Sequence, residues 1–298
     1  MNKKAFSLIE LSIVILIIGI LIAGVTQSSR LISRMRLAAA RSLTQSSPVN
    51  SIRDIVGWFE TTTEKSFGGN EPEEDFDGGS GGISTWYDIN PQTTYPNNAT
   101  SASTTNNPGY TKSESIGYLP TLRFNGSDQY LMFDGTTLAN SNYSIFVVEQ
   151  RTTGDGDYKY MIASAEPAGV PNQLLQVGYR NSSTLTWGQF NNDYNIDVEA
   201  YSAPVARIHS LVFNSSAATP RFYYLNGISQ TLNANDTPDP SHVLDSYTNA
   251  TFGFYGTDQN VFYQGYIGEI IIFSRALKTE ERLAIEAYLG KKWGIKLN

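Results

Sequence analysis

The stretch GEIIIFSRALKTEERLAIEAYLGKKWGI, residues 268–295, changes its pattern halfway along. Its first part is an isoleucine-rich apolar run typical of a buried strand, and we predict a strand over residues 266–273. Thr279 then stands where a helix cap is expected, followed by acids that suit the positive end of a helix, and Gly294 favours a stop. One helical face carries Ile285, Leu289 and Trp293. The stretch predicts a strand followed by a short amphipathic helix that packs on a sheet.

Earlier in the chain, short runs of β-branched and aromatic residues alternate with clusters of Gly, Asn, Asp and Pro. This pattern is typical of an antiparallel β-sandwich, so we predict a mainly β fold beyond residue 48. The clearest other strands are predicted at 121–124, 129–133, 143–150, 173–179, 208–213 and 220–226. Two segments, 68–82 and 97–107, are rich in turn residues, and we expect both to be exposed and mobile loops.

The composition excludes several kinds of chemistry. The chain has 298 residues and no cysteine, so disulfides, thiolate nucleophiles and thiolate metal sites are excluded. Its formal net charge is -7. Because phosphates would be repelled over most of an acidic surface, we expect no nucleic-acid partner.

The amino terminus, MNKKAFSLIELSIVILIIGILIAGV over residues 1–25, places two lysines before a long apolar run. The run has about the length of a bilayer-spanning helix, roughly 20 residues. Glu10 stands inside it, and a charged residue in such a helix is costly and usually functional. No Gly or Pro interrupts residues 27–45, and Pro48 supplies a stop, so we predict one helix over residues 6–47.

Beyond the apolar run, this helix is predicted to carry two faces. The apolar face holds Leu31, Ile32, Met35, Ala39 and Leu43, and the opposite face holds Arg30, Arg34 and Arg41. An apolar stripe of this kind needs a partner, because its residues would otherwise stay in water. The sequence leaves open whether that partner is the chain's own globular domain or a neighbouring subunit.

Residues 4–10, KAFSLIE, resemble the cleavage and methylation signature of type IV prepilins and pseudopilins. The resemblance implies that a prepilin peptidase cuts between Ala5 and Phe6 on the cytoplasmic side, and that Phe6 is then N-methylated. It also implies that Glu10 meets the amino terminus of a neighbouring subunit in a filament, where a buried carboxylate needs a partner. Ala5 stands where the family usually has glycine, and a small residue is thereby retained before the cut.

A second resemblance covers roughly residues 53–296. The segments that carry it are DIVGWF at 54–59, STWYD at 84–88, LPTLRFNGS at 119–127, YLNG at 224–227 and the stretch 268–295. They are similar to bacterial laminin-G-like domains of the concanavalin A-like superfamily, which implies a jelly-roll sandwich. Because that superfamily includes lectins, hydrolases and interaction modules, the resemblance supports the fold better than the function.

The sequence offers no catalytic constellation. Retaining glycosidases need two carboxylates about 5–5.5 Å apart, and the Glu-x-Asp-x-x-Glu strand of this superfamily's glucanases does not occur here. Glu269 is the only acid in its predicted strand, and we interpret it as an outward-facing or paired residue. Neither His209 nor His242 has a serine or metal-ligand pattern around it, and His209 fits a sandwich position. We expect no catalytic residues and no enzymatic activity.

Two ligand hypotheses are weaker. Asp75 and Asp77, in an acidic and glycine-rich segment, could supply oxygen ligands to calcium, although clustered acids are usually solvated. No other cofactor is expected. A sugar could be stacked and hydrogen-bonded by Trp187, Tyr179, Asn191 and Asp193. Aromatic residues make up 12% of the chain, so core packing is the favoured interpretation of these two rings.

These observations divide the chain into a leader peptide (1–5), a transmembrane and assembly helix (6–47) and a laminin-G-like jelly-roll domain (48–298). They predict a pilin-like or pseudopilin-like subunit of a type IV pilus or type II secretion filament. The large globular domain favours a minor subunit. The alternative is a pilus-borne adhesin or carbohydrate-binding module, and a membrane-anchored glycan-active enzyme is less supported.

The expected partners are prepilin peptidase, other pilin or pseudopilin subunits, the inner membrane, and surface glycans or proteins. We expect a single-pass protein of the bacterial inner membrane with a periplasmic carboxyl-terminal domain. After processing, we expect it in a pilus or pseudopilus that can extend outside the cell.

Overall fold

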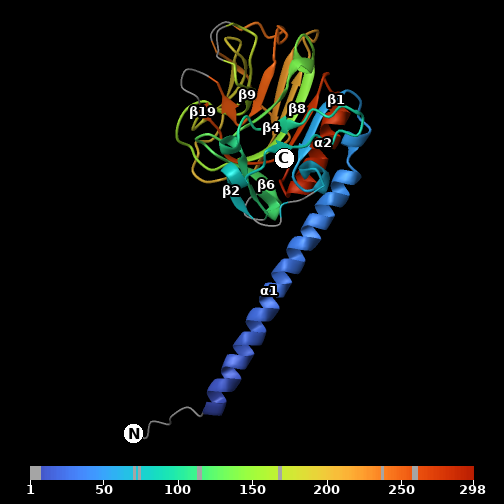
Figure 1. Cartoon of the computed structure of the whole chain (residues 1–298). Coiled ribbons are helices and arrows are strands. Elements are labelled where there is room, and N and C mark those ends of the chain that lie inside the picture. Colours follow the sequence, from blue (N-terminus) through green and yellow to red (C-terminus); the bar gives the residue numbers. More distant parts are fainter. Residues whose placement is uncertain are drawn as a thin grey trace.

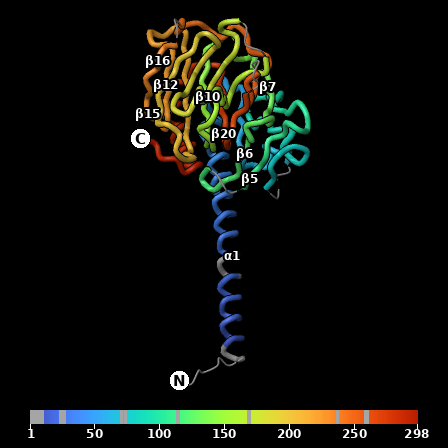
Figure 2. Tube along the Cα trace, turned by 90° about the vertical axis from the view of Figure 1, so that its left-hand side faces the viewer, coloured from blue at the N-terminus to red at the C-terminus, as the bar shows by residue number. Residues whose placement is uncertain are grey.

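The computed structural model describes residues 8–69, 72, 75–112, 116–166, 170–235, 238–256 and 261–298, without the side chains of residues 8–10 and 23–27. Helix α1 (Leu8–Gln45) projects as a long rod from a β-rich body (Figures 1 and 2). The predicted helix is confirmed, and it ends just before Pro48. Within the described ranges no helix combines enough length with enough apolar character to cross a bilayer, so the membrane span stays a prediction.

Two antiparallel sheets face each other in the body. Sheet A has the order β15 (Ile228–Ser229), β14 (Arg221–Leu225), β13 (Arg207–Phe213), β8 (Tyr143–Arg151), β20 (Gln264–Phe273), β6 (Thr121–Asn125), β5 (Pro108–Thr111) and β2 (Phe76–Gly78), and β1 (Ile55–Glu60) also pairs with β20. Sheet B has the order β16 (Asn233–Ala234), β12 (Tyr194–Asp197), β11 (Thr184–Gln189), β10 (Leu175–Asn181), β9 (Lys159–Ser164), β17 (Asn249–Phe252), β7 (Leu131–Asp134), β4 (Ala99–Thr100) and β3 (Thr85–Trp86). A separate hairpin joins β18 (Phe254–Tyr255) to β19 (Val261–Phe262). The predicted mainly β sandwich is confirmed.

Strand β20 is buried on both faces, which explains why its sequence is a continuous apolar run. Ile270 and Ile272 lie in the core between the two sheets. Ile271 and Phe273 alternate with them and lie in a second apolar core on the other side of sheet A. Because neither face meets water, the strand has no polar alternation.

Helix α2 (Thr279–Trp293) covers this second core and lies beside β1 at the end of the body that meets α1 (Figure 1). Its predicted buried face is confirmed for Ile285, Leu289 and Trp293. The predicted cap is wrong by one residue, because the N-cap is Lys278, whose backbone N–H donates to the Glu281 carboxylate at 2.9 Å. Gly294 ends the helix at φ +66°, a left-handed conformation that glycine adopts without strain.

The carboxyl end of α1 packs on the body through buried Ala40 and half-buried Leu43. Leu31, Ile32 and Met35, from the predicted apolar stripe, are instead 60%, 47% and 64% exposed. The stripe is therefore divided between two environments. Leu43 contacts the chain's own domain, and the three residues nearer the amino terminus face outward.

The two predicted loops contain short elements. Segment 68–82 contributes β2, and segment 97–107 contributes β4, which pairs with β3 and β7. The expected exposure is wrong at Ala99 and Asn107, since both are buried. A strand of two or three residues has no periodicity of its own, so its place depends on the neighbouring strands.

Candidate functional site

An exposed apolar surface runs along α1. Leu16, Ile20 and Leu21 are more than half exposed, and their large apolar neighbours between Leu11 and Ile22 are similarly accessible. Apolar surface in water costs about 25 cal/mol per Å², and a continuous apolar surface marks contact with a partner or a membrane. This surface is the first candidate functional site.

The residues predicted to begin assembly lie immediately before this surface. Ala5 and Phe6 fall outside the described residues. Glu10 belongs to α1, and the description covers its backbone alone. The processing motif and the exposed apolar surface are therefore consecutive in the chain.

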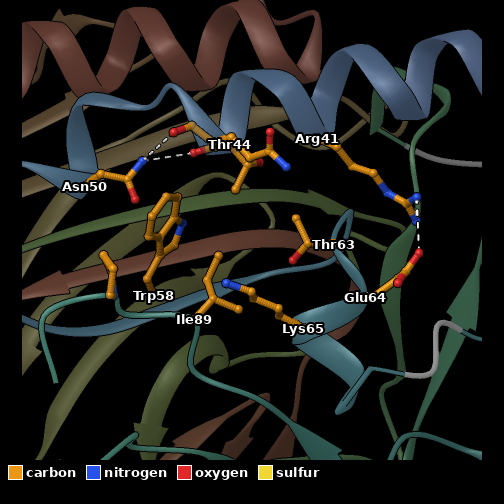
Figure 3. Close-up of a pocket in the computed structure, with 10 residues that line it drawn as sticks. Arg41, Thr44, Asn50, Trp58, Thr63, Glu64, Lys65 and Ile89 are labelled. Carbon is orange, nitrogen blue, oxygen red and sulfur yellow. Dashed lines mark hydrogen bonds and ion pairs between the residues drawn. The ribbon is translucent and has the colours of Figure 1, made fainter. Parts of the chain in front are cut away.

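The foot of α1 is tied to the body by polar contacts as well as apolar packing. Arg41 Nε donates to the Thr62 carbonyl at 2.8 Å, and Arg41 Nη1 lies 3.6 Å from the Glu64 carboxylate (Figure 3). Farther along α1, the Thr44 hydroxyl lies 3.4 Å from the Tyr288 hydroxyl of α2. These contacts fix the direction in which the helix leaves the body.

A cavity of about 370 Å³ lies between the foot of α1 and the body (Figure 3). Trp58 and Ile89 supply apolar walls, and Asn50 donates to the last carbonyls of α1. Among its described lining residues Glu64 is the single acid, so the cavity holds no pair of carboxylates for acid–base chemistry. Trp58 and Thr63 also hydrogen-bond to a buried group of charges next to the cavity.

That group, the charge centre, consists of Glu60, Glu269 and Lys292. Glu60 of β1 stands directly opposite Glu269 of β20 in the strand ladder. Lys292 reaches between them from α2, with its Nζ 2.8 Å from Oε2 of each carboxylate. All three side chains are 0% exposed. Facing carboxylates repel each other, so the buried lysine is what makes this register tolerable. Glu269 was predicted to be either outward-facing or paired, and the structure shows it paired.

Glu60 is surrounded by hydrogen-bond donors. Its carboxylate accepts from the backbone N–H groups of Thr62 and Thr63 at 2.8 Å and from both of their hydroxyls at 2.5 Å. The Ser66 hydroxyl adds a further bond at 2.9 Å. Burial raises the pKa of Glu60, but the charge of Lys292 and the hydrogen bonds outweigh burial and lower that pKa to about 2. The N–H and O–H donors around Glu60 therefore stabilise negative charge on its carboxyl oxygens.

Glu269 has a different set of partners. The indole N–H groups of Trp58 and Trp293 donate to it at 2.8 Å, and the Tyr288 hydroxyl donates at 2.7 Å. Burial lowers the pKa of Lys292, but the two carboxylates outweigh burial and raise it. Large rings therefore shield the charge centre from water. The sequence analysis did not predict the charge centre. One signal was available, because Lys292 follows Ile285 by seven residues and so falls on the buried face of α2.

A second buried polar group lies within the sandwich. Glu149 of β8 accepts from the hydroxyls of Tyr179 at 2.7 Å and Tyr263 at 2.5 Å, and it lies 2.9 Å from His209 Nε2. The other ring nitrogen of His209 lies 2.6 Å from the Tyr223 hydroxyl. Burial raises the pKa of Glu149, but the hydrogen bond and charge of His209 outweigh burial and lower it. All five residues are buried, so none offers a reactive atom to a substrate in solution.

The two rings weighed for sugar stacking are both buried, in agreement with the core packing that the sequence favoured. Trp187 is 0% exposed and donates its indole N–H to the Tyr143 hydroxyl at 3.0 Å, and Tyr179 is 1% exposed beside Glu149. Both rings are covered by the body, so neither offers a face to a sugar. Asn191 is exposed at positive φ, and buried Asp193 lies 3.6 Å from Arg180.

The two aspartates considered for calcium have protein partners. Asp75 accepts from the backbone N–H of Lys112 at 2.6 Å, and Asp77 forms an ion pair with Arg123. Across the described ranges, no group of three or more His, Cys, Asp or Glu side chains is placed to hold a metal ion. Calcium binding at Asp75 and Asp77 stays a prediction.

Comparison with known proteins supports the interpretation of the amino terminus. Residues 1–26 match the model of the prokaryotic N-terminal methylation motif. No match is found among curated proteins. Solved structures similar to this chain include a Trypanosoma rangeli sialidase, at 12% identity and TM-score 0.46 over 83% of this chain and 34% of that one. Another is the Ruminococcus gnavus IT-sialidase CBM40 bound to α2,6-sialyllactose, at 12% identity and TM-score 0.43 over 56% of this chain and 96% of that one.

The leech intramolecular trans-sialidase is also similar, at 15% identity and TM-score 0.42 over 56% of this chain and 27% of that one. The chain thus spans about a third or less of the length of these two sialidases. At such identities and TM-scores, the likenesses carry no argument about activity.

Proposed function

We propose that this chain is a minor pilin-like or pseudopilin-like subunit of a type IV pilus or type II secretion filament. It is cut before Phe6 by prepilin peptidase, methylated there, and assembled through α1, and it displays its sandwich on the filament. The observation that carries the proposal is the methylation motif at residues 1–26, which leads directly into a projecting helix with exposed apolar residues.

Assembly is supported by what the apolar residues of α1 would gain. In the single chain, about half or more of the side-chain surface of Leu31, Ile32 and Met35 is exposed to water. Packing such residues against the same helix of neighbouring subunits removes them from water, at about 1.5–3 kcal/mol for each fully buried side chain. In the membrane before assembly, lipid can cover the more amino-terminal part of the surface.

A structural role without catalysis completes the proposal. Three acids of the body, Glu60, Glu149 and Glu269, are fully buried and hydrogen-bonded to protein groups. Glycoside hydrolysis needs carboxylates that contact the substrate and an incoming water. These three acids stabilise the body instead, which fits a displayed domain whose role is to hold its shape.

Replacement of Glu10 tests the proposal. Glu10→Ala is expected to abolish incorporation into filaments sheared from cells, measured by immunoblot of the filament fraction. The sandwich is expected to keep its resistance to limited proteolysis, because Glu10 is the third residue of α1 and the amino-terminal end of this helix lies far from the body (Figure 1). The exposed Glu199→Ala is the matched control and should assemble normally. Normal incorporation of Glu10→Ala would contradict the central residue of the proposal.

A further inference from the structure

The charge centre brings a primary amine and a carboxyl group together in a dry place. Lys292 Nζ and Glu60 Oε2 are 2.8 Å apart although the residues are 232 positions apart in the chain, and both side chains are fully buried. A third group, Glu269 Oε2, lies 2.8 Å from the same nitrogen. The carboxyl carbon of Glu60 is one bond behind the oxygen that Nζ already contacts.

We propose that Lys292 and Glu60 condense to form an isopeptide bond, an amide between Nζ and Cδ, with Glu269 as the proton carrier. The bond would be a modification site that joins β1 to α2. This inference does not rest on the proposed function, because it depends on the charge centre alone.

The reaction balances without a cofactor. Glu269 takes one proton from the Lys292 ammonium group and passes it to a Glu60 oxygen, which leaves a neutral amine beside a neutral carboxylic acid. The freed lone pair of Nζ then attacks Cδ of Glu60. The tetrahedral intermediate then loses a Glu60 oxygen as water. That water carries away two protons of the original ammonium group, one of them returned by Glu269. An ammonium and a carboxylate become an amide and one water molecule, and Glu269 ends as it began.

The surroundings of Glu60 favour it as the acyl group. Negative charge develops on its oxygens in the intermediate, and the backbone N–H groups of Thr62 and Thr63 already donate to those oxygens at 2.8 Å. Preorganised donors of this kind are the largest single contribution to many acyl transfers. Glu269 contacts two indole N–H groups, a phenol hydroxyl and the lysine, whereas Glu60 also has the backbone donors, so Glu269 suits the role of proton carrier.

Burial moves the equilibrium towards the amide. Condensation in water is opposed by the surrounding solvent, but two groups held in contact react at effective concentrations of about 10⁵–10⁸ M. The released water leaves for bulk solvent. Hydrolysis would require a water beside Lys292 and Glu60, where the exposed area of both side chains is zero. The rings of Trp58, Trp293 and Tyr288 occupy the neighbouring space.

Peptide mapping tests for the bond in the full-length chain without substitutions, purified in detergent. Trypsin should release residues 54–65, which contain Glu60, covalently joined to residues 292–296, at a mass lower than the sum of the two peptides by one water, about 18 Da. Trypsin cuts after Lys292 when its amine is free, so the free 54–65 peptide and residues 293–296 should be correspondingly depleted. Recovery of 54–65 and 293–296 unjoined overturns the proposal, and this test requires no substituted variant. Linkage of 292–296 to residues 222–275 would place the bond on Glu269 and overturn the assignment to Glu60.

Two variants test the role of Glu269. Glu269→Gln cannot take the proton, and general acid–base groups contribute about 10²–10⁴-fold to rate, so the joined fraction soon after synthesis is expected to fall at least about tenfold. Glu64→Gln changes an exposed acid in the same tryptic peptide as Glu60 and should leave the joined fraction unchanged. An unchanged fraction in Glu269→Gln would overturn its role as proton carrier.

Discussion

The helix and the body distribute apolar and charged residues in opposite ways. Helix α1 exposes large apolar residues such as Leu16 and Met35, whereas the body buries Glu60, Glu269 and Lys292 completely. Each arrangement is unfavourable for a side chain taken alone, because apolar groups are stabilised by burial and charges by water. The body compensates internally, by pairing its charges. The exposed apolar side chains described along α1 stay in water in the single chain, so a membrane or a partner that covers them would stabilise them.

This comparison separates two kinds of substitution. Changes in the buried charges should alter the stability of the body, and changes on the outward face of α1 should alter assembly and leave that stability unaffected. All four tryptophans lie buried in the body, so tryptophan fluorescence reports its unfolding without interference from α1.

The largest effect is expected for Lys292→Met. Removing the amine leaves Glu60 and Glu269 facing each other with no cation between them. Breaking a buried ion pair from one side typically costs about 3–5 kcal/mol, a large share of the stability of an ordinary domain. Urea denaturation of the full chain, followed by tryptophan fluorescence, measures the change. A loss below about 1 kcal/mol would show that the body does not depend on this pairing.

A triple variant distinguishes charge from packing at the same place. Glu60→Gln, Glu269→Gln and Lys292→Met together remove all three charges and keep similar side-chain volumes. Replacement of a complete buried ion group is often neutral, so the part of the loss in Lys292→Met that comes from unpaired charge should return, and the part that comes from the proposed link to Glu60 should not. If the triple variant is as unstable as the single one, packing or a covalent link at Lys292 is the larger contribution.

The sequence predicted the parts of the body whose signals are local. The strand at 266–273 and the buried face of α2 follow from a continuous apolar run and a helical period, and both are confirmed. The charge centre could not be predicted in this way. Its members meet because β1 pairs with β20 in one register and α2 lies over both, and that register is a tertiary property.

Trp187 also shows that a local sequence pattern does not determine a residue's tertiary environment. Trp187 lies two residues after Leu185 on β11, and both face the core between the sheets. Period-two alternation identifies two faces of a strand but does not say which of them a partner sheet covers. The sugar-stacking hypothesis required the outward face, and the structure gives Trp187 the inward one. The apolar stripe on α1 had the opposite outcome, since its period is correct but Leu31, Ile32 and Met35 stay about half exposed or more.

A smaller effect is expected for Glu149→Gln in the second buried polar group. The amide keeps the shape of the carboxylate, but its NH₂ group faces hydroxyl donors and the His209 ring, so one charge-assisted hydrogen bond is lost. Bonds of this kind contribute about 1.5–3 kcal/mol, and we expect a loss near 2 kcal/mol in urea denaturation. The exposed Glu199→Gln serves as control and should change stability by less than about 0.5 kcal/mol. Equal effects of the two variants would contradict the importance of this group.

Two substitutions on α1 test the comparison within one helix. Ala40→Leu adds volume where α1 packs on the body, and overpacking typically costs about 1–3 kcal/mol. Met35→Ser changes a 64% exposed side chain and should leave urea denaturation of the body unchanged, while it lowers incorporation into the sheared filament fraction. If Met35→Ser lowers the stability of the body, or if this variant enters filaments normally, then the outward face of α1 does not act in subunit contacts alone.

The smallest effect concerns Glu281 at the start of α2. Two hydrogen bonds from Arg275, at 2.6 and 2.8 Å, together with the backbone N–H of Lys278, lower the pKa of Glu281 from an ordinary 4.5 to about 2 and outweigh the raising effect of burial. A carboxyl with a lowered folded-state pKa stabilises the fold above its unfolded pKa, and this contribution is lost as pH falls from about 4.5 to about 2. Because a quarter of the side chain is exposed, we expect about 1 kcal/mol at neutral pH. Urea denaturation of Glu281→Gln and of the chain without substitutions should therefore differ at pH 7 and converge as the pH falls below about 2. A difference that persists there would assign the effect to packing of the cap instead of its charge.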